Sequence, residues 1–232
     1  MCDFEWEEAG LPERYRGVTL DMCPPDSAEK VREFCLGHGT QVMVIQGGNG
    51  TCKTQTACAA FTERADAGKN LGLYLSAKYQ LCPLFRSARL SNFAMSEYEL
   101  YQKYYTTPFL AIDEVGKGDD RNLERTVIRN ILSARYDRNV LTLIITNLTV
   151  HELLGDGESS EGFLGLGNDI KSRFHETAAV ITMAGDDWRG QNRMQPYTER
   201  KPLKASVIKC LLCGSPMDES GSCTNPKCTC HI

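Results

Sequence analysis

The fold of this chain is decided by eight residues, Gly47-Gly48-Asn49-Gly50-Thr51-Cys52-Lys53-Thr54, which stand between an apolar run and a helix-like segment. Glycines allow a loop to turn tightly enough to aim several backbone N–H groups inward. Within such a loop Lys53 is placed to reach the β- and γ-phosphates of a nucleotide, and Thr54 to bind Mg²⁺. We therefore expect all eight residues to form a phosphate-binding loop at the positive end of the following helix.

One residue of this loop departs from the usual pattern, in which a glycine stands immediately before the lysine. Cys52 occupies that position here, and its side chain crowds the phosphates unless its backbone stays in an allowed region. The alternatives to a working nucleotide loop are a glycine-rich turn without a ligand and a loop controlled by oxidation of the Cys52 thiol.

A second motif supports the nucleotide interpretation. The apolar residues 109–112 read as a strand that ends in Asp113 and Glu114. P-loop enzymes use an acid in the position of Asp113 to hold Mg²⁺. Glu114 is then placed to polarise the attacking water as a general base. A strand that ends in two acids is often only a solvated turn, but after a phosphate loop it favours a hydrolytic site.

A third strand, predicted at Leu141–Thr146, is followed by Asn147. If this strand lies next to the one that carries Asp113, Asn147 could orient the lytic water near the terminal phosphate. An isolated asparagine after a strand is usually a turn former. The catalytic role predicted for Asn147 therefore depends on the two other motifs.

Short apolar runs alternate with helix-like stretches along the chain, which predicts an α/β fold with a mostly parallel five-stranded sheet covered by helices. The expected strands are Gln41–Gln46, Leu71–Ser76, Phe109–Asp113, Leu141–Thr146 and Ala178–Met183. The clearest helices are expected at Thr54–Ala67 and Leu123–Asp137. Ser96 and Glu99 have capping-box spacing, which predicts a helix start just before Tyr98. The segment Gly155–Gly167 reads as a loop.

Composition limits the class of protein. The chain has 232 residues, 41% of them hydrophobic and 24% charged, so we expect one packed α/β domain and a small appendage. The formal net charge of −4 argues against a protein that coats nucleic acid wholesale, although it permits a local basic patch. No apolar run approaches the roughly 18 residues of a membrane span, and the acidic N-terminus lacks the layout of a signal peptide. These features predict a cytoplasmic protein.

Cysteines crowd the C-terminal stretch of the sequence. Two pairs there would supply four thiolates to a structural Zn²⁺ ion: Cys210, Cys213, Cys223 and Cys228. Because so short a segment cannot bury an adequate core, the metal would supply its folding free energy. Cys230 or His231 could replace Cys228, so the fourth ligand is left open. The alternatives are a thiol-rich tail, redox-active thiols and an iron–sulfur cluster.

With these residues in place, the chain resembles the DnaC/IstB-type AAA+ ATPases, a group of helicase loaders and transposition helpers. The resemblance spans roughly residues 9 to 190 and consists of short matches in a common order. Besides the phosphate loop, the matching segments are Ala9–Tyr15, Ile112–Gly116, Ala134–Tyr136, Thr146–Leu148, Ile170–Phe174 and Gly185–Arg189.

The resemblance implies roles that the residues alone do not. Arg173 would be an arginine finger that reaches the γ-phosphate bound by a neighbouring subunit, which implies a homo-oligomer; otherwise it is a plain surface arginine. Arg189 would sense the nucleotide, or it is the first charge of a basic linker. The segment Ala77–Met95 falls where this group carries a helical element facing nucleic acid. It holds basic and aromatic residues suited to single strands, or to a solvated amphipathic helix: Lys78, Arg86, Arg89, Tyr79, Phe85 and Phe93.

We expect a lead-in segment at residues 1–30, an AAA+ core at 31–190, a basic linker at 191–209 and a zinc-ribbon-like module at 210–232. The expected function is ATP binding and hydrolysis by a protein that acts on DNA, in single-stranded form, and loads or remodels a replication protein. A transposition helper with the same ATPase core is one alternative. A nucleotide-gated adaptor with little hydrolysis is the other, and Cys52 supports it.

Overall fold

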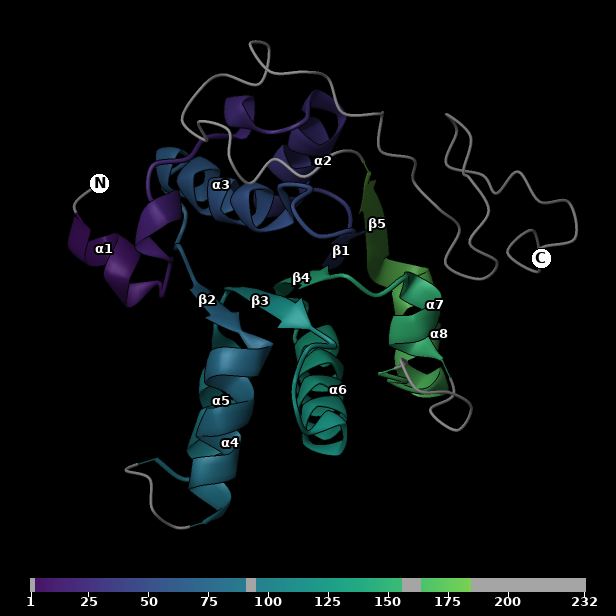
Figure 1. Cartoon of the computed structure of the whole chain (residues 1–232). Helices are drawn as coiled ribbons and strands as arrows, with labels where there is room; N and C mark the ends of the chain where they lie inside the picture. Colours follow the sequence, from purple (N-terminus) through teal and green to yellow (C-terminus); the bar gives the residue numbers. More distant parts are fainter. Residues whose placement is uncertain (1–2, 91–94, 156–163, 185–232) are drawn as a thin grey trace, which may run out of the picture.

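The computed structural model describes residues 3–90, 95–155 and 164–184, and a parallel sheet forms its centre (Figure 1). The strands are β1 (Val42–Gly47), β2 (Leu73–Ser76), β3 (Phe109–Val115), β4 (Leu141–Thr146) and β5 (Ala178–Met183). They lie in the order β2-β3-β4-β1-β5, and every pair of neighbours is parallel. The predicted α/β fold with a five-stranded sheet is therefore confirmed.

One face of the sheet is covered by helices from the first third of the chain, namely α1 (Asp3–Glu8), α2 (Pro25–Cys35) and α3 (Lys53–Asp66) (Figure 1). Short 3₁₀ turns at Glu13–Tyr15 and Leu20–Met22 join α1 to α2. Three buried alanines let α3 approach the strands closely, and Phe61 meets Phe109 edge-on with ring centroids 5.0 Å apart. This layer fixes the direction in which α3 leaves the phosphate loop.

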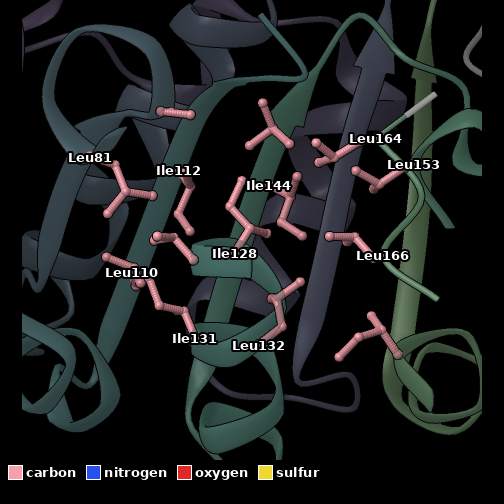
Figure 2. Packing of buried hydrophobic residues seen from close by; sticks show 14 of the residues in the cluster. Leu81, Leu110, Ile112, Ile128, Ile131, Leu132, Ile144, Leu153, Leu164 and Leu166 are labelled. Carbon is pink, nitrogen blue, oxygen red and sulfur yellow. The ribbon is translucent and has the colours of Figure 1, made fainter. Parts of the chain in front are cut away.

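The opposite face carries the remaining helices, α4 (Cys82–Arg89), α5 (Glu97–Thr106), α6 (Arg121–Asp137), α7 (Val150–Leu154) and α8 (Asn168–Thr177). A π-helical turn at Ala77–Leu81 precedes α4. Figure 2 shows α6 directing Ile128, Ile131 and Leu132, which have helical spacing, toward the apolar residues of β3 and β4. Among the helices that the structure describes, none is long and apolar enough to cross a bilayer.

A buried arginine ties this second layer to the sheet. Arg135 of α6 is only 1% exposed and donates to the carbonyl oxygens of Tyr104 and Thr107, at 2.6 and 2.7 Å, and to the hydroxyl of Thr142 at 2.7 Å. Burying a guanidinium without such acceptors would be costly. Its acceptors lie around the ends of α5 and the start of β4, so Arg135 supports the fold at a distance from the strand ends that face the pocket.

The predicted element boundaries are close, with one correction that matters for the site. Ser96 caps α5 through a complete capping box with Glu99, as predicted. The third strand was expected to end at Asp113, but β3 runs to Val115. The ladder with β4 shifts register between Ile112 and Val115, and Glu114 has a positive φ of 58°. The two acids therefore lie in a β-bulge, which a simple apolar pattern does not reveal.

Candidate functional site

The carboxyl ends of β1, β3 and β4 meet at an open pocket. Six of the eight predicted loop residues line it: Asn49, Gly50, Thr51, Cys52, Lys53 and Thr54. Asp113, Glu114 and Asn147 line the same pocket from the ends of the neighbouring strands. The structure thus brings together the three motifs that were predicted separately along the sequence.

The phosphate loop is shaped by glycine and by bonds within itself. Gly47 has a φ of 152°, and a Cβ atom there would lie 2.1 Å from the carbonyl oxygen of Met183. The Lys53 ammonium donates to the carbonyl oxygens of Gly47, at 2.9 Å, and Gly48, at 2.5 Å. The Thr51 hydroxyl also donates to Gly48, at 2.9 Å. The loop is therefore closed on itself, and its last two residues, Lys53 and Thr54, form the start of α3.

Cys52 occupies the position just before α3, and its backbone is in the left-handed region, with φ of 66° and ψ of 13°. A residue with a Cβ atom in this conformation costs roughly 1–2 kcal/mol compared with glycine. The conformation explains why a glycine is usual at this position. Cys52 therefore preserves the shape of the loop at the expense of local strain.

Asp113 is the most buried carboxylate of the pocket, with 4% of its surface exposed. Its Oδ2 accepts the Thr54 hydroxyl at 2.7 Å and the Tyr74 hydroxyl at 2.6 Å. Its Oδ1 accepts the backbone N–H of Glu114 at 2.6 Å. Burial and then the charge of Asp113 raise the pKa of Tyr74 far above its ordinary value, so this hydroxyl remains a donor. A hydroxyl and a carboxylate held side by side form an oxygen donor set that suits Mg²⁺.

Glu114 is held on both sides by residues that the sequence analysis did not select. Its Oε2 accepts the Ser76 hydroxyl at 2.7 Å, and its Oε1 lies 3.8 Å from the Lys117 ammonium. Ser76 also accepts the backbone N–H of Tyr79 at 3.1 Å, which caps the π-helical turn. The carboxylate at the end of β3 is thus linked through Ser76 to the start of the α4 region.

Asn147 completes the arrangement from β4, which lies between β3 and β1 as its predicted role required. Its side-chain amide donates to the side-chain oxygen of Asn49 in the phosphate loop, at 2.7 Å and across 98 positions of sequence. Asn147 therefore stands beside the loop rather than turning away from it. The catalytic role itself remains a prediction.

Comparison with solved structures identifies the fold. The crystal structure of DnaI is similar with a TM-score of 0.58 at 18% identity, over 75% of this chain and 95% of that one. The structure of the DnaC helicase loader gives 0.56 at 19% identity, over 74% of this chain and 99% of that one. The chain has an AAA+ fold.

A third AAA+ structure, the replication initiator DnaA bound to AMPPCP and single-stranded DNA, gives a TM-score of 0.56 at 18% identity. It aligns with 76% of this chain, which covers 51% of the DnaA chain. No family model and no curated protein sequence matches the chain. At these identities the likeness concerns the AAA+ fold, and the site has to be judged from its own residues.

Arg173, the predicted arginine finger, is held by contacts outside the pocket. Arg173 of α8 lies against α6, where it donates to the hydroxyl of Ser133, stands 3.8 Å from Asp137 and covers the ring of Tyr136 at 4.9 Å. It does not line the pocket of its own chain. Arg189 lies outside the described residues.

The predicted zinc ligands also lie outside the described residues, as do their alternatives: Cys210, Cys213, Cys223, Cys228, Cys230 and His231. In the ranges that are described, no group of three His, Cys, Asp or Glu side chains is arranged to hold a metal ion. The zinc site therefore remains a prediction from the cysteine spacing.

Of the two interpretations left open for the segment Ala77–Met95, the one that faces nucleic acid does not extend to Phe85. Phe85 is fully buried, with ring centroids 4.5 Å from Tyr101 and 6.2 Å from Tyr104, because α4 turns its apolar side into the core. Phe93 lies outside the described residues. Tyr79 is 67% exposed, so it is the aromatic side chain of this segment that solvent can reach in the described part.

The basic residues of the same segment contact acids of neighbouring elements. Lys78 pairs with Asp119 at 3.7 Å, and Arg89 with Glu97 at 2.9 Å. Arg86 lies 4.0 Å from Asp120. Partly exposed pairs of this kind contribute little stability, so phosphates could compete for the cations.

Some of the pocket residues were not selected as site residues from the sequence, and two of them come from the lead-in segment. Arg14 and Tyr15 line the pocket from the lead-in segment, and the Arg14 guanidinium lies 4.8 Å from the centre of the Tyr15 ring. The available signal was that both fall within the segment Ala9–Tyr15, which is one of the short stretches that carry the sequence resemblance. A cation and an aromatic ring in the lining of the pocket have the chemistry to contact the base or sugar of a nucleotide.

Proposed function

We propose that this chain binds ATP with Mg²⁺ and hydrolyses it while assisting DNA replication, in the manner of a helicase loader. One observation carries the proposal: a phosphate loop, an Mg²⁺-type donor pair and a carboxylate beside them line a single pocket. These are the parts that P-loop hydrolysis requires.

The residues fit the substrate and its metal. The phosphate loop begins at Gly47, a position that suits glycine because a Cβ atom there would meet a backbone oxygen. Thr54 and Asp113 offer neighbouring oxygens to Mg²⁺. Bound Mg²⁺ would neutralise charge on the β- and γ-phosphates. Lys53, with the N–H groups of the loop and of the first turn of α3, would hold the phosphate oxygens.

Glu114 would then orient the attacking water and accept its proton, with Asn147 as the second contact to that water. Both oxygens of Glu114 already have neighbours, Ser76 and Lys117. A water molecule near the terminal phosphate must share or replace one of them. The rate of hydrolysis should therefore depend on how these neighbours are arranged.

The fold and the predicted arginines support a proposal about partners. DnaC, DnaI and DnaA share the fold, and the DnaA structure contains single-stranded DNA and an ATP analogue. We propose that single-stranded DNA and a replication protein are the partners of this chain. Arg173, which stands away from its own pocket, would act on the nucleotide of a neighbouring subunit, and Arg189 would sense the nucleotide. Such a finger contributes on the order of 10³–10⁵ in rate.

The domain layout is part of the proposal: lead-in 1–30, AAA+ core 31–190, basic linker 191–209 and zinc module 210–232. Cys210, Cys213, Cys223 and Cys228 would hold one structural zinc ion. Metal analysis of purified protein should then give about one equivalent of zinc per chain. Protein that folds and contains no zinc would refute the module.

The test of the proposed function is steady-state ATP hydrolysis by zinc-replete protein, with and without single-stranded DNA, beside Glu114→Gln and Arg173→Ala. We expect DNA to stimulate turnover and Glu114→Gln to lower kcat by about 10²–10⁴. Glu33→Gln, on the exposed side of α2, is the matched control and should behave as wild type. Turnover that survives Glu114→Gln would refute the catalytic assignment.

The adaptor is the second candidate, because Cys52 is strained and Glu114 is engaged by two neighbours. Tight ATP binding without turnover, with or without DNA, would favour it over the ATPase. A transposition helper would show the same hydrolysis but respond to a transposase rather than to a replication protein.

A further inference from the structure

The turn that follows Glu114, residues 115–118, is held in place by side chains from other elements. The carbonyl oxygen of Val115 accepts the Thr146 hydroxyl at 2.7 Å. The backbone N–H groups of Gly116 and Gly118 both point at the carboxylate of Glu124 on α6. The turn follows directly on the left-handed residue Glu114, so its position determines where the Glu114 backbone stands.

Glu124 has an unusual environment for a carboxylate. It is 0% exposed, in the first turn of α6, and each oxygen accepts one backbone N–H: Oε1 from Gly116 at 2.7 Å and Oε2 from Gly118 at 3.1 Å. Burial raises the pKa of Glu124, while these two bonds and the charge of Arg121 lower it. A buried carboxylate is tolerated when its oxygens are bonded in this way.

Neighbouring side chains pack closely against the two glycines of the turn, Gly116 and Gly118. A Cβ atom at Gly118 would lie 2.7 Å from Oε2 of Glu124, and one at Gly116, where φ is 87°, would lie 2.4 Å from Leu148. The two bonded N–H groups flank Lys117, whose ammonium lies 3.8 Å from Glu114. The Glu124 carboxylate thus bonds the backbone on both sides of Lys117, which lines the pocket.

We propose that Glu124 is a positioning residue of the candidate active site. It fixes the turn from Val115 to Gly118 and thereby sets where Glu114 and Lys117 stand relative to the nucleotide. Glu124 itself is not among the residues that line the pocket. The proposal rests on the proposed ATPase function for its kinetic consequence, but not for the structural one.

The test is Glu124→Gln in the full chain, because glutamine keeps the size of the side chain and replaces one acceptor by a donor. That donor would face a backbone N–H, so one of the two bonds is lost. Three quantities are measured: hydrogen exchange of the Gly116 and Gly118 amides, the Kd for ATP with Mg²⁺, and kcat. We expect exchange at both amides to become at least about tenfold faster and kcat to fall about tenfold, with Kd within about threefold of wild type.

Two variants complete the design. Glu33→Gln removes one carboxylate from an exposed position and should change none of the three quantities. Glu124→Asp keeps the charge but shortens the side chain by one methylene, which weakens the bonds to both N–H groups, so exchange at Gly116 and Gly118 should be faster and kcat lower than in wild type. If Glu124→Gln does not fold, Glu124→Asp carries the test with the same readouts.

Unchanged exchange at Gly116 and Gly118 would overturn the proposal, and so would faster exchange with an unchanged kcat. If wild-type protein itself shows no turnover, the proposed function fails on its own. In that case the exchange of the two amides still decides whether Glu124 holds the turn, so the two failures are distinguishable.

Discussion

Two chain segments meet at the pocket, and they are held in different ways. The phosphate loop is shaped by its own glycines and by bonds that Lys53 and Thr51 make back to its own carbonyl groups. The end of β3 and the turn after it, residues 114–118, are held by Ser76, Thr146 and Glu124, which come from three other elements. The first segment can be recognised from adjacent residues, whereas the second exists only once the domain has folded. Mutations should therefore act locally in the first and through distant partners in the second.

The largest effect is expected at the loop itself, from Gly47→Ala. The added Cβ atom would meet the carbonyl oxygen of Met183 at 2.1 Å, and backbone atoms of a central sheet cannot easily move away. We expect the free energy of unfolding to fall by about 3 kcal/mol. Urea unfolding followed by circular dichroism measures it. A loss below about 1 kcal/mol would show that the loop is less rigid than its geometry indicates.

The matching substitution in the second segment, Gly116→Ala, should cost less. Here the Cβ atom would meet the end of the Leu148 side chain, which can rotate, so the main penalty is the left-handed backbone. We expect a loss of about 1–2 kcal/mol. In the double variant that combines Gly116→Ala with Leu148→Ala, the same unfolding experiment should show part of this lost stability restored. An effect as large as that of Gly47→Ala would remove the contrast between the two segments.

Cys52→Gly should be stabilising, because it relieves the left-handed conformation inside the phosphate loop. The gain of about 1–2 kcal/mol is partly offset by the greater freedom of glycine in the unfolded chain, about 0.5–1 kcal/mol. We therefore expect a net gain of about 0.5–1 kcal/mol, with ATP affinity equal to or better than wild type. Oxidation by a mild oxidant should weaken ATP binding in wild type and not in the variant if the thiol acts as a switch.

The last effect expected is a pH dependence of the free energy of unfolding, which arises from Glu124 in the second segment. Because the pKa of Glu124 is raised on folding, the folded state binds its proton more tightly than the unfolded state. Its contribution to stability is therefore present below the ordinary glutamate pKa of about 4.3 and is lost as pH rises through the folded value.

The measurement is the free energy of unfolding of wild type minus that of Glu124→Gln, from about pH 4 upward. The difference should fall with increasing pH, by at most about 1.4 kcal/mol per pH unit. A difference that stays flat would mean that the two N–H bonds fully offset the burial of the charge. Gly47→Ala, in place of Glu124→Gln, should give a flat difference over the same range.

The sequence predicts the fold well because the strands are short apolar runs and the phosphate loop is a contiguous motif. Lys53, Thr54 and Asp113 stand where their spacing indicates, since parallel strands end at one edge of the sheet. The end of β3 was misplaced because the strand continues through a bulge, and a bulge leaves no trace in an apolar pattern.

Residues that act through tertiary contacts could not be predicted in the same way. Ser76 lies at the end of β2, 38 positions from the carboxylate that it contacts. Nothing in the neighbouring sequence distinguishes it from an ordinary polar residue at the end of a strand. Glu124 reads as an ordinary acid in the first turn of a helix. The place of Phe85 was left open by the sequence, because an aromatic residue among arginines suits a nucleic-acid surface and the buried side of a helix equally.

The strand order has a consequence for the order of events during protein synthesis. β1 lies between β4 and β5, both of which are made long after it. As the chain leaves the ribosome from its N-terminus, β1 has no partner in the sheet until Leu141–Thr146 emerges. The phosphate loop, which directly follows β1, is thus among the last segments to reach its native surroundings. If the pocket binds ATP as we propose, the nucleotide should stabilise the newly made domain only after β4 has joined the sheet.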